Sequence, residues 1–165
     1  MTTHAIPQVV IAAVDVSFDS DPSIAAHIVD VATSYARLAG ARLAILTACP
    51  PPPIPSLGPL DPLNVSVVAM REVLDAMLAQ ARERLQQLVE RAHKEGVVAT
   101  VHMLTEPGRL PDLLADAAQA IAGGDGRGLL VLSSRGKKGL SRLLGSVAER
   151  TAHLSHVPVL LLPPD

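Results

Sequence analysis

Aromatic residues are almost absent from this sequence: it has one Phe, one Tyr and no Trp in 165 residues. Proteins that read single-stranded nucleic acid stack bases on aromatic side chains, so this composition argues against that class. A core without aromatic rings has to be built from Ala, Val, Leu and Ile. The hydrophobic share of 48% is large enough to supply such a core.

Cysteine is equally scarce, because Cys49 is the only one. A single cysteine excludes an internal disulfide framework and is typical of a reducing compartment. The net charge of −2 is not that of a polycation that binds nucleic acid. No apolar run approaches the roughly 18 residues of a membrane span, and no basic segment precedes an apolar one at the N-terminus. We therefore expect a cytoplasmic protein that binds neither nucleic acid nor membranes.

Apolar runs alternate with helical patterns along the chain. Strands are predicted at residues 9–17, 42–49, 97–106, 128–134 and 157–162. Helical spacing predicts helices at residues 22–39, 66–95, 111–122 and 146–155. This order predicts one α/β domain over residues 1–165, with a mostly parallel, doubly wound sheet and helices on both faces. Such sheets bind ligands outside the carboxyl ends of their strands.

A proline-rich segment, residues 50–65, precedes the longest predicted helix. Seven of the fourteen residues at 50–63 are proline, which excludes a helix or a central strand. A lid over a site is the first interpretation of this long irregular segment, and a polyproline ligand for a partner is the second. The following helix carries one apolar stripe, from Met70 to Ala92, that we expect to face the core. Arg84 is assigned to its solvated face.

The stretch LSSRGKKGLSRLLGSVAER, residues 132–150, contains five basic residues, three glycines and one acid. Glycine lets a ligand approach backbone amides, and Gly145-Ser146 opens a helix whose N-terminus favours phosphate. The same residues also fit a purely structural interpretation. Ser146 and Glu149 have the spacing of a capping box, and the lysines have the character of a solvated surface. On these residues alone, an anion site and an ordinary turn both stay open.

Several motifs with known chemistry are missing. No GxxxxGK[ST] loop and no GxGxxG after the first strand are present, which argues against a Walker loop and a dinucleotide fold. No HExxH or CxxC is present, so no metal site is predicted. Asp15 is the one carboxylate at a strand end that faces the expected ligand edge. No acid–base pair accompanies it.

Four features together resemble the universal stress protein family over essentially the whole chain. They are the first strand with its terminal aspartate (VVIAAVDVS), the proline-broken region before the long helix, the glycine turn at Gly108, and LLVLSSRGKKGLSRLLGSVAERTAHLSHVPVLLL near the C-terminus. Nucleotide-binding members of that family carry Gly, two residues, Gly, nine residues, then Gly and Ser or Thr. The resemblance implies a five-stranded sheet in the order 3-2-1-4-5. It also implies a homodimer formed through the apolar C-terminal edge strand.

The resemblance further implies an ATP site, with or without Mg²⁺. Asp15 would meet the ribose and the Ala48 backbone would meet the adenine. The phosphates would meet the remaining candidates, which are Ser133, Gly136, Lys137, Lys138, Gly145 and Ser146. Two departures stand out: Ser133 replaces the family's first glycine, and eight residues instead of nine separate Gly136 from Gly145.

The first hypothesis is accordingly a stress-response regulator that binds ATP. The two departures keep a second hypothesis open, in which the chain has lost the nucleotide and acts as a dimeric module for a regulatory protein partner. An ATPase ranks third. Because no general base is evident, any hydrolysis is expected to be slow.

Overall fold

The structure is a computed structural model that describes residues 6–17, 19–50, 64–134 and 145–163. Five strands form one parallel sheet in the order β3-β2-β1-β4-β5, which confirms the predicted fold class and strand order. The strands are β1 (Val9–Ala13), β2 (Arg42–Ala48), β3 (Ala99–Leu104), β4 (Gly128–Ser133) and β5 (Val159–Leu162). The helices are α1 (Pro22–Ala39), α2 (Asn64–Lys94), α3 (Leu110–Ala122) and α4 (Ser146–Leu154).

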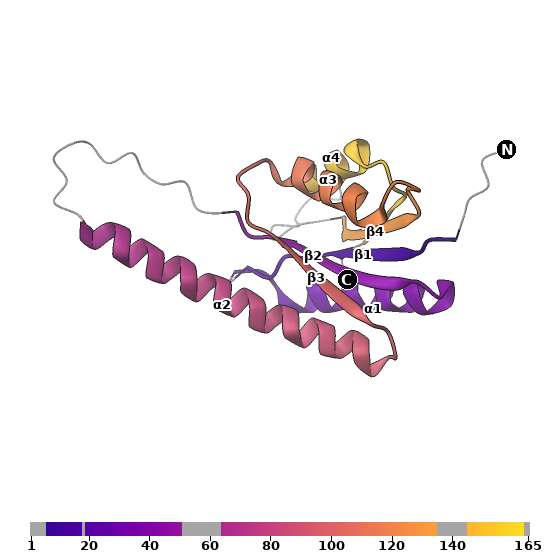
Figure 1. The fold of residues 1–165 in the computed structure, drawn as a ribbon, viewed down its shortest axis with the longest axis horizontal. Helices are drawn as coiled ribbons and strands as arrows, with labels where there is room; N and C mark the ends of the chain where they lie inside the picture. The colour runs from indigo at the N-terminus through magenta and orange to yellow at the C-terminus, as the bar shows by residue number, and fades with distance from the viewer. Residues whose placement is uncertain (1–5, 18, 51–63, 135–144, 164–165) are drawn as a thin grey trace.

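Helices cover both faces of the sheet, with α1 and α2 on one side and α3 and α4 on the other (Figure 1). Successive residues of β1 point to opposite faces, as in any strand. Val10 packs with the α1–α2 layer, whereas Ile11 packs with the α3–α4 layer. The largest fully buried side chains are aliphatic and include Leu43, Ile45 and Leu130. The core is therefore the aliphatic one that the composition predicts.

Both ends of α1 are determined by capping residues that can be recognised in the sequence. The Asp21 carboxylate caps it by accepting a hydrogen bond from the Ser23 amide at 2.9 Å, and Pro22 opens the first turn. Hydrogen bonds from the Ser23 amide and hydroxyl lower the pKa of the Asp21 carboxyl. Gly40 ends the helix with φ 63°, a conformation that favours glycine. Both ends agree with the prediction because each depends on local residues alone.

Helix α2 differs from the prediction at its N-terminal half. Its C-terminal half packs on α1 and β3 and buries Ala81, Leu85 and Leu88. The N-terminal half projects beyond the sheet instead, as Figure 1 shows, and leaves Met70 and Met77 exposed. The expectation that the whole apolar stripe faces the core is therefore wrong for this half. The sheet is too short to cover a helix of 31 residues.

The proline-rich segment predicted at 50–65 falls mostly outside the described residues, but α2 already begins at Asn64. The observed strands are shorter than the apolar runs that predicted them, since β1 stops at Ala13 and β5 starts at Val159. In the part of the chain that the structure describes, no helix is both long enough and apolar enough to cross a membrane.

Candidate functional site

Strands β1 and β4 are neighbours at the point where the chain order of the sheet reverses. Beyond the strand ends, backbone hydrogen bonds keep the segments aligned. The Val14 amide donates to the Leu46 carbonyl at 2.9 Å, and the Ser134 amide donates to the Leu162 carbonyl at 2.7 Å. In parallel α/β sheets this switch point is where ligands bind. The candidate site is therefore the carboxyl edge of the sheet around β1 and β4.

Asp15 lies two residues beyond the end of β1 and is exposed at this edge. Its Oδ1 accepts a hydrogen bond from the Ser17 amide at 2.9 Å, which turns the chain toward α1. Ala13 is in register with Leu46. Continuing that register by two residues brings Asp15 level with Ala48, so the two predicted nucleoside contacts lie side by side.

Arg84 of α2 holds the loop that follows Asp15. Its guanidinium donates to the carbonyl oxygens of Ser17 at 2.5 Å and Val16 at 3.4 Å, and to the Ser20 hydroxyl at 3.3 Å. The assignment of Arg84 to a solvated face is wrong, because the side chain is only partly exposed. A signal was present: Arg84 stands four residues before Leu88, on the side of the helix that meets the core.

A cleft of about 380 Å³ adjoins this loop. Asp15 and Ser20 line it from the loop, Pro22 from the start of α1, and Arg84 and Lys94 from α2. The cleft gives Asp15 a hollowed surface between its loop and α2, and the α2 wall carries Glu90 as well as basic side chains. A lining with charges of both signs suits a polar ligand.

Cys49 directly follows the last residue of β2 and lies close enough to Asp15 to be affected by its charge. Its amide donates to the Leu104 carbonyl at 2.7 Å, which ties the end of β2 to β3. Burial raises the pKa of the Cys49 thiol, and the negative charge of Asp15 raises it further. The thiol is therefore protonated at neutral pH and is a poor nucleophile. The effect of the Asp15 charge on Cys49 agrees with their places after the neighbouring strands β1 and β2.

Alkylation of Cys49 provides a measure of this proximity. Replacing Asp15 by Asn removes the charge while keeping an oxygen for the Ser17 amide. The Cys49 pKa then falls, and we expect iodoacetamide to modify the folded variant a few-fold faster than wild type at mildly alkaline pH. Asp19→Asn, in the same loop, is the control and should not change the rate. An unchanged alkylation rate in Asp15→Asn would show that the Asp15 carboxylate does not influence the Cys49 thiol.

The N-terminus of α4 is attached directly to the end of β4. The Gly145 amide donates to the Ser134 carbonyl at 2.7 Å, and the Gly145 carbonyl accepts the first helical hydrogen bond from the Glu149 amide at 3.0 Å. Gly145 is the N-cap, and Ser146 is already the first helical residue. The capping-box interpretation, which needs Ser146 at the cap, is therefore wrong. The exposed side chain of Ser146 lies on the first turn of α4, where the backbone amides and the helix dipole attract anions.

The structure thus brings five of the predicted residues to one edge of the sheet: Asp15, Ala48, Ser133, Gly145 and Ser146. The other three, Gly136, Lys137 and Lys138, lie outside the described residues. Arg84 and Cys49 are additional residues at this edge that the sequence analysis did not assign to a site. Among the residues that can be described, no group of three metal-ligating side chains occurs.

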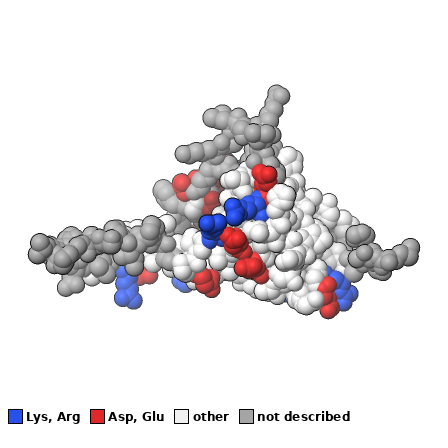
Figure 2. Space-filling model, turned by 90° about the horizontal axis from the view of Figure 1, so that it is seen from above, with Lys and Arg blue, Asp and Glu red and all other residues white. Residues whose placement is uncertain are grey.

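Charges of both signs lie next to one another on the face of the molecule that Figure 2 shows, and most of its described surface is uncharged. Arg127 and Asp125, just before β4, form an ion pair with 3.2 Å between Nη2 and Oδ2.

Comparison with known proteins places the chain among proteins of one family. The model of the universal stress protein family matches residues 8–163. A universal stress protein from Lactobacillus plantarum superposes with a TM-score of 0.72 at 19% identity, covering 96% of this chain and 99% of that one. Among curated proteins, no sequence matches significantly.

Two similar structures contain nucleotides. A universal stress protein in complex with cAMP is 24% identical, with a TM-score of 0.63 and coverage of 96% of this chain and 98% of that one. The universal stress protein from Archaeoglobus fulgidus in complex with dAMP is 22% identical, with a TM-score of 0.60 and coverage of 96% and 98%. These structural similarities show a shared fold. The family model matches nearly the whole chain and therefore also shows family membership. This chain belongs to the universal stress protein family.

Proposed function

We propose that this protein binds ATP at the carboxyl edge of its sheet, between β1 and β4. The observation that carries the proposal is the 2.7 Å hydrogen bond from the Gly145 amide to the Ser134 carbonyl. It joins the start of α4 to the end of β4 at the point where the strand order reverses. The free amides of a first helical turn, together with the helix dipole, form a binding site for phosphate.

The nucleoside is assigned to the neighbouring strand ends. The Asp15 carboxylate is exposed and has acceptor capacity for the ribose hydroxyl groups in addition to the Ser17 amide. The backbone at Ala48, level with Asp15, has an amide and a carbonyl of the kind that pair with an adenine edge. Ribose and base then lie beside β1 and β2, with the phosphates toward α4.

The phosphates are assigned to α4 and to the segment before it. Ser146 contributes its amide and hydroxyl, and Ser133 contributes its hydroxyl from the end of β4. Because the Gly145 amide is already bonded to Ser134, we assign Gly145 the role of leaving space for a phosphate close to the backbone. Gly136, Lys137 and Lys138 are retained as proposed contacts on the basis of the sequence.

Two further facts support this choice of ligand. The family relatives in complex with cAMP and dAMP both hold adenine nucleotides. Magnesium is usually bound through one or two carboxylates plus substrate phosphates, so it does not require a separate protein cage. When ATP is bound, Mg²⁺ would supply charge neutralisation on its phosphates, while the residues named above hold and orient the nucleotide.

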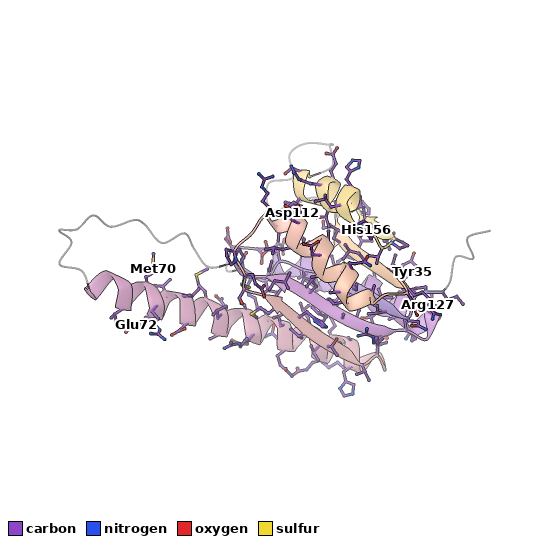
Figure 3. All side chains as sticks on the ribbon, turned by 45° about the horizontal axis from the view of Figure 1, so that its top comes forward. Tyr35, Met70, Glu72, Asp112, Arg127 and His156 are labelled. Atoms are coloured by element: carbon purple, nitrogen blue, oxygen red, sulfur yellow. The ribbon has the colours of Figure 1, made fainter. Side chains whose placement is uncertain are left out.

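Calorimetric titration with ATP, with and without Mg²⁺, tests the proposal. We expect saturable binding, weakened by about tenfold to a hundredfold in Asp15→Asn because one charge-assisted hydrogen bond is worth about 1.5–3 kcal/mol. Glu72→Gln is the matched control, since it also removes one carboxylate but lies on the projecting part of α2 (Figure 3). Absence of heat at millimolar ATP, in protein whose folding is verified by circular dichroism, would contradict the proposal.

A dimeric protein-interaction module is the second candidate function, because two apolar surfaces are available for it. One is β5, which among the described residues pairs with β4 alone and whose Val159 and Leu161 are half-buried. We propose this edge for the homodimer that the sequence predicts. The other is the projecting half of α2.

A further inference from the structure

Ser17, in the loop between β1 and α1, is hydrogen-bonded through both of its backbone polar groups. Its amide donates to Oδ1 of Asp15 at 2.9 Å, and its carbonyl oxygen accepts from Nη1 of Arg84 at 2.5 Å. A single residue therefore links the guanidinium of α2 to the carboxylate that follows β1. Any movement of the Ser17 backbone also moves the amide that orients Asp15.

The same guanidinium nitrogen contacts two further acceptors in this loop. Nη1 of Arg84 lies 3.4 Å from the Val16 carbonyl oxygen and 3.3 Å from the Ser20 hydroxyl oxygen. Ser20 in turn donates to the Ser17 carbonyl from its amide at 3.0 Å and from its hydroxyl at 2.6 Å. Val16 is only 3% exposed, so water has little access to its carbonyl. Loss of the guanidinium would therefore weaken the attachment of the whole turn to α2.

Asp15 is the residue of this loop whose orientation matters most for a ligand, because its side chain is exposed. An exposed side chain loses conformational entropy when a ligand fixes it, and that loss weakens binding. The Ser17 amide already restricts the carboxylate, and Arg84 keeps Ser17 in place. Preorganisation of this kind raises the affinity without any added contact to the ligand.

We propose that Arg84 is a positioning residue of the nucleotide site: it fixes Ser17, and through Ser17 it sets the orientation of the Asp15 carboxylate toward the ribose. This inference rests on the proposed function, since Asp15 is the residue that contacts the nucleotide. Arg84 belongs to α2, a helix to which no contact with ATP is assigned. The affinity of the site therefore depends on how α2 packs against the loop after β1.

A double-mutant cycle measured by calorimetric titration with ATP tests the proposal. Arg84→Met removes the guanidinium but keeps a long apolar stem on the partly buried face, and we expect it to weaken ATP binding by about threefold to tenfold. Arg84→Lys should recover part of the loss, because an ammonium group also donates to carbonyl oxygens. In an Asp15→Ala background, Arg84→Met should change the affinity by less than about twofold, because no carboxylate is left to orient.

Arg82→Met is the matched control for this cycle. It makes the same chemical change on an exposed position of the same helix and should leave the affinity for ATP unchanged. A purely structural role of Arg84 would give the same fractional loss of affinity with and without the Asp15 carboxylate. Such additive losses, in variants whose folding is verified by circular dichroism, would overturn the proposal.

Alkylation of Cys49 tests the positioning of Asp15 without ATP. The charge of Asp15 raises the pKa of the Cys49 thiol, so a displaced carboxylate raises it less. We expect iodoacetamide to modify Arg84→Met a few-fold faster than wild type, and Arg84→Met to have no further effect in the Asp15→Ala background. Equal rates in Arg84→Met and wild type would overturn the proposal. If wild type shows no heat with ATP but the alkylation cycle is non-additive, the ATP site is contradicted, whereas the positioning of Asp15 by Arg84 stands.

Discussion

Gly145→Val is expected to lower the affinity for ATP by about tenfold or more, because each lost charge-assisted hydrogen bond is worth about 1.5–3 kcal/mol. Gly145 has φ −65° and ψ 141°, an extended conformation that valine also adopts. The new side chain would occupy the space beside the first turn of α4 where the proposed phosphate lies. Calorimetric titration with ATP measures the loss.

The fold should survive this substitution. Valine is a poorer N-cap than glycine, and the cost is about 1 kcal/mol. Gly124→Val is the matched control, since it makes the same chemical change in the turn before β4, where an added Cβ meets nothing within 4 Å. Full affinity for ATP in a folded Gly145→Val protein would show that the phosphates do not bind at the N-terminus of α4.

Gly128→Ala is expected to destabilise the protein by about 2 kcal/mol, the middle of the range for overpacked cores. Gly128 is buried at the start of β4, and a Cβ there would stand 2.8 Å from the Ala122 Cβ and 3.4 Å from Val157 Cγ1. Neither neighbour is a flexible side-chain end, so α3 itself has to shift. For a chain of this size the melting temperature should fall by about 4–8 °C.

Gly124→Ala is again the control, because nothing lies within 4 Å of its added Cβ. Its stability should stay within about 0.5 kcal/mol of wild type. Urea unfolding of both variants gives the comparison. Equal stability of the two variants would show that α3 and β4 are packed more loosely than the 2.8 Å approach indicates.

The elements that depend on neighbouring residues were predictable. Asp21 and Gly40 bound α1 as expected, because a cap is a contact between residues a few positions apart. The strand order 3-2-1-4-5 came from the family resemblance, and the structure confirms it.

Arg84 and the projecting half of α2 show where sequence patterns were insufficient. The apolar stripe of α2 identifies a face whose burial is favourable, but the length of the sheet decides how much of that face is buried. Arg84 stands on the inner side of the same helix, yet its role depends on carbonyl groups more than sixty residues away in sequence. A pattern with helical period indicates that Arg84 is on the core-facing side, but it shows neither which carbonyl groups Arg84 binds nor how far the sheet extends.

The candidate site divides in the same way. The aspartate after β1 and the glycine-serine pair before α4 are visible in the sequence as residue types suited to a nucleotide. That Asp15 lies level with Ala48, and that Gly145 is bonded to Ser134, follows only from strand register and from the return of α4 to the sheet.

By itself, the sequence determined the aliphatic core, the alternation of elements and the ends of α1, since these follow from composition and short-range contacts, and its motifs indicated the family by resemblance. The tertiary structure alone decided which half of α2 is covered, that Gly145 rather than Ser146 caps α4, and which strand ends meet. The physical reason is that each of these depends on contacts between segments far apart in the chain, and such contacts exist only once the sheet has formed.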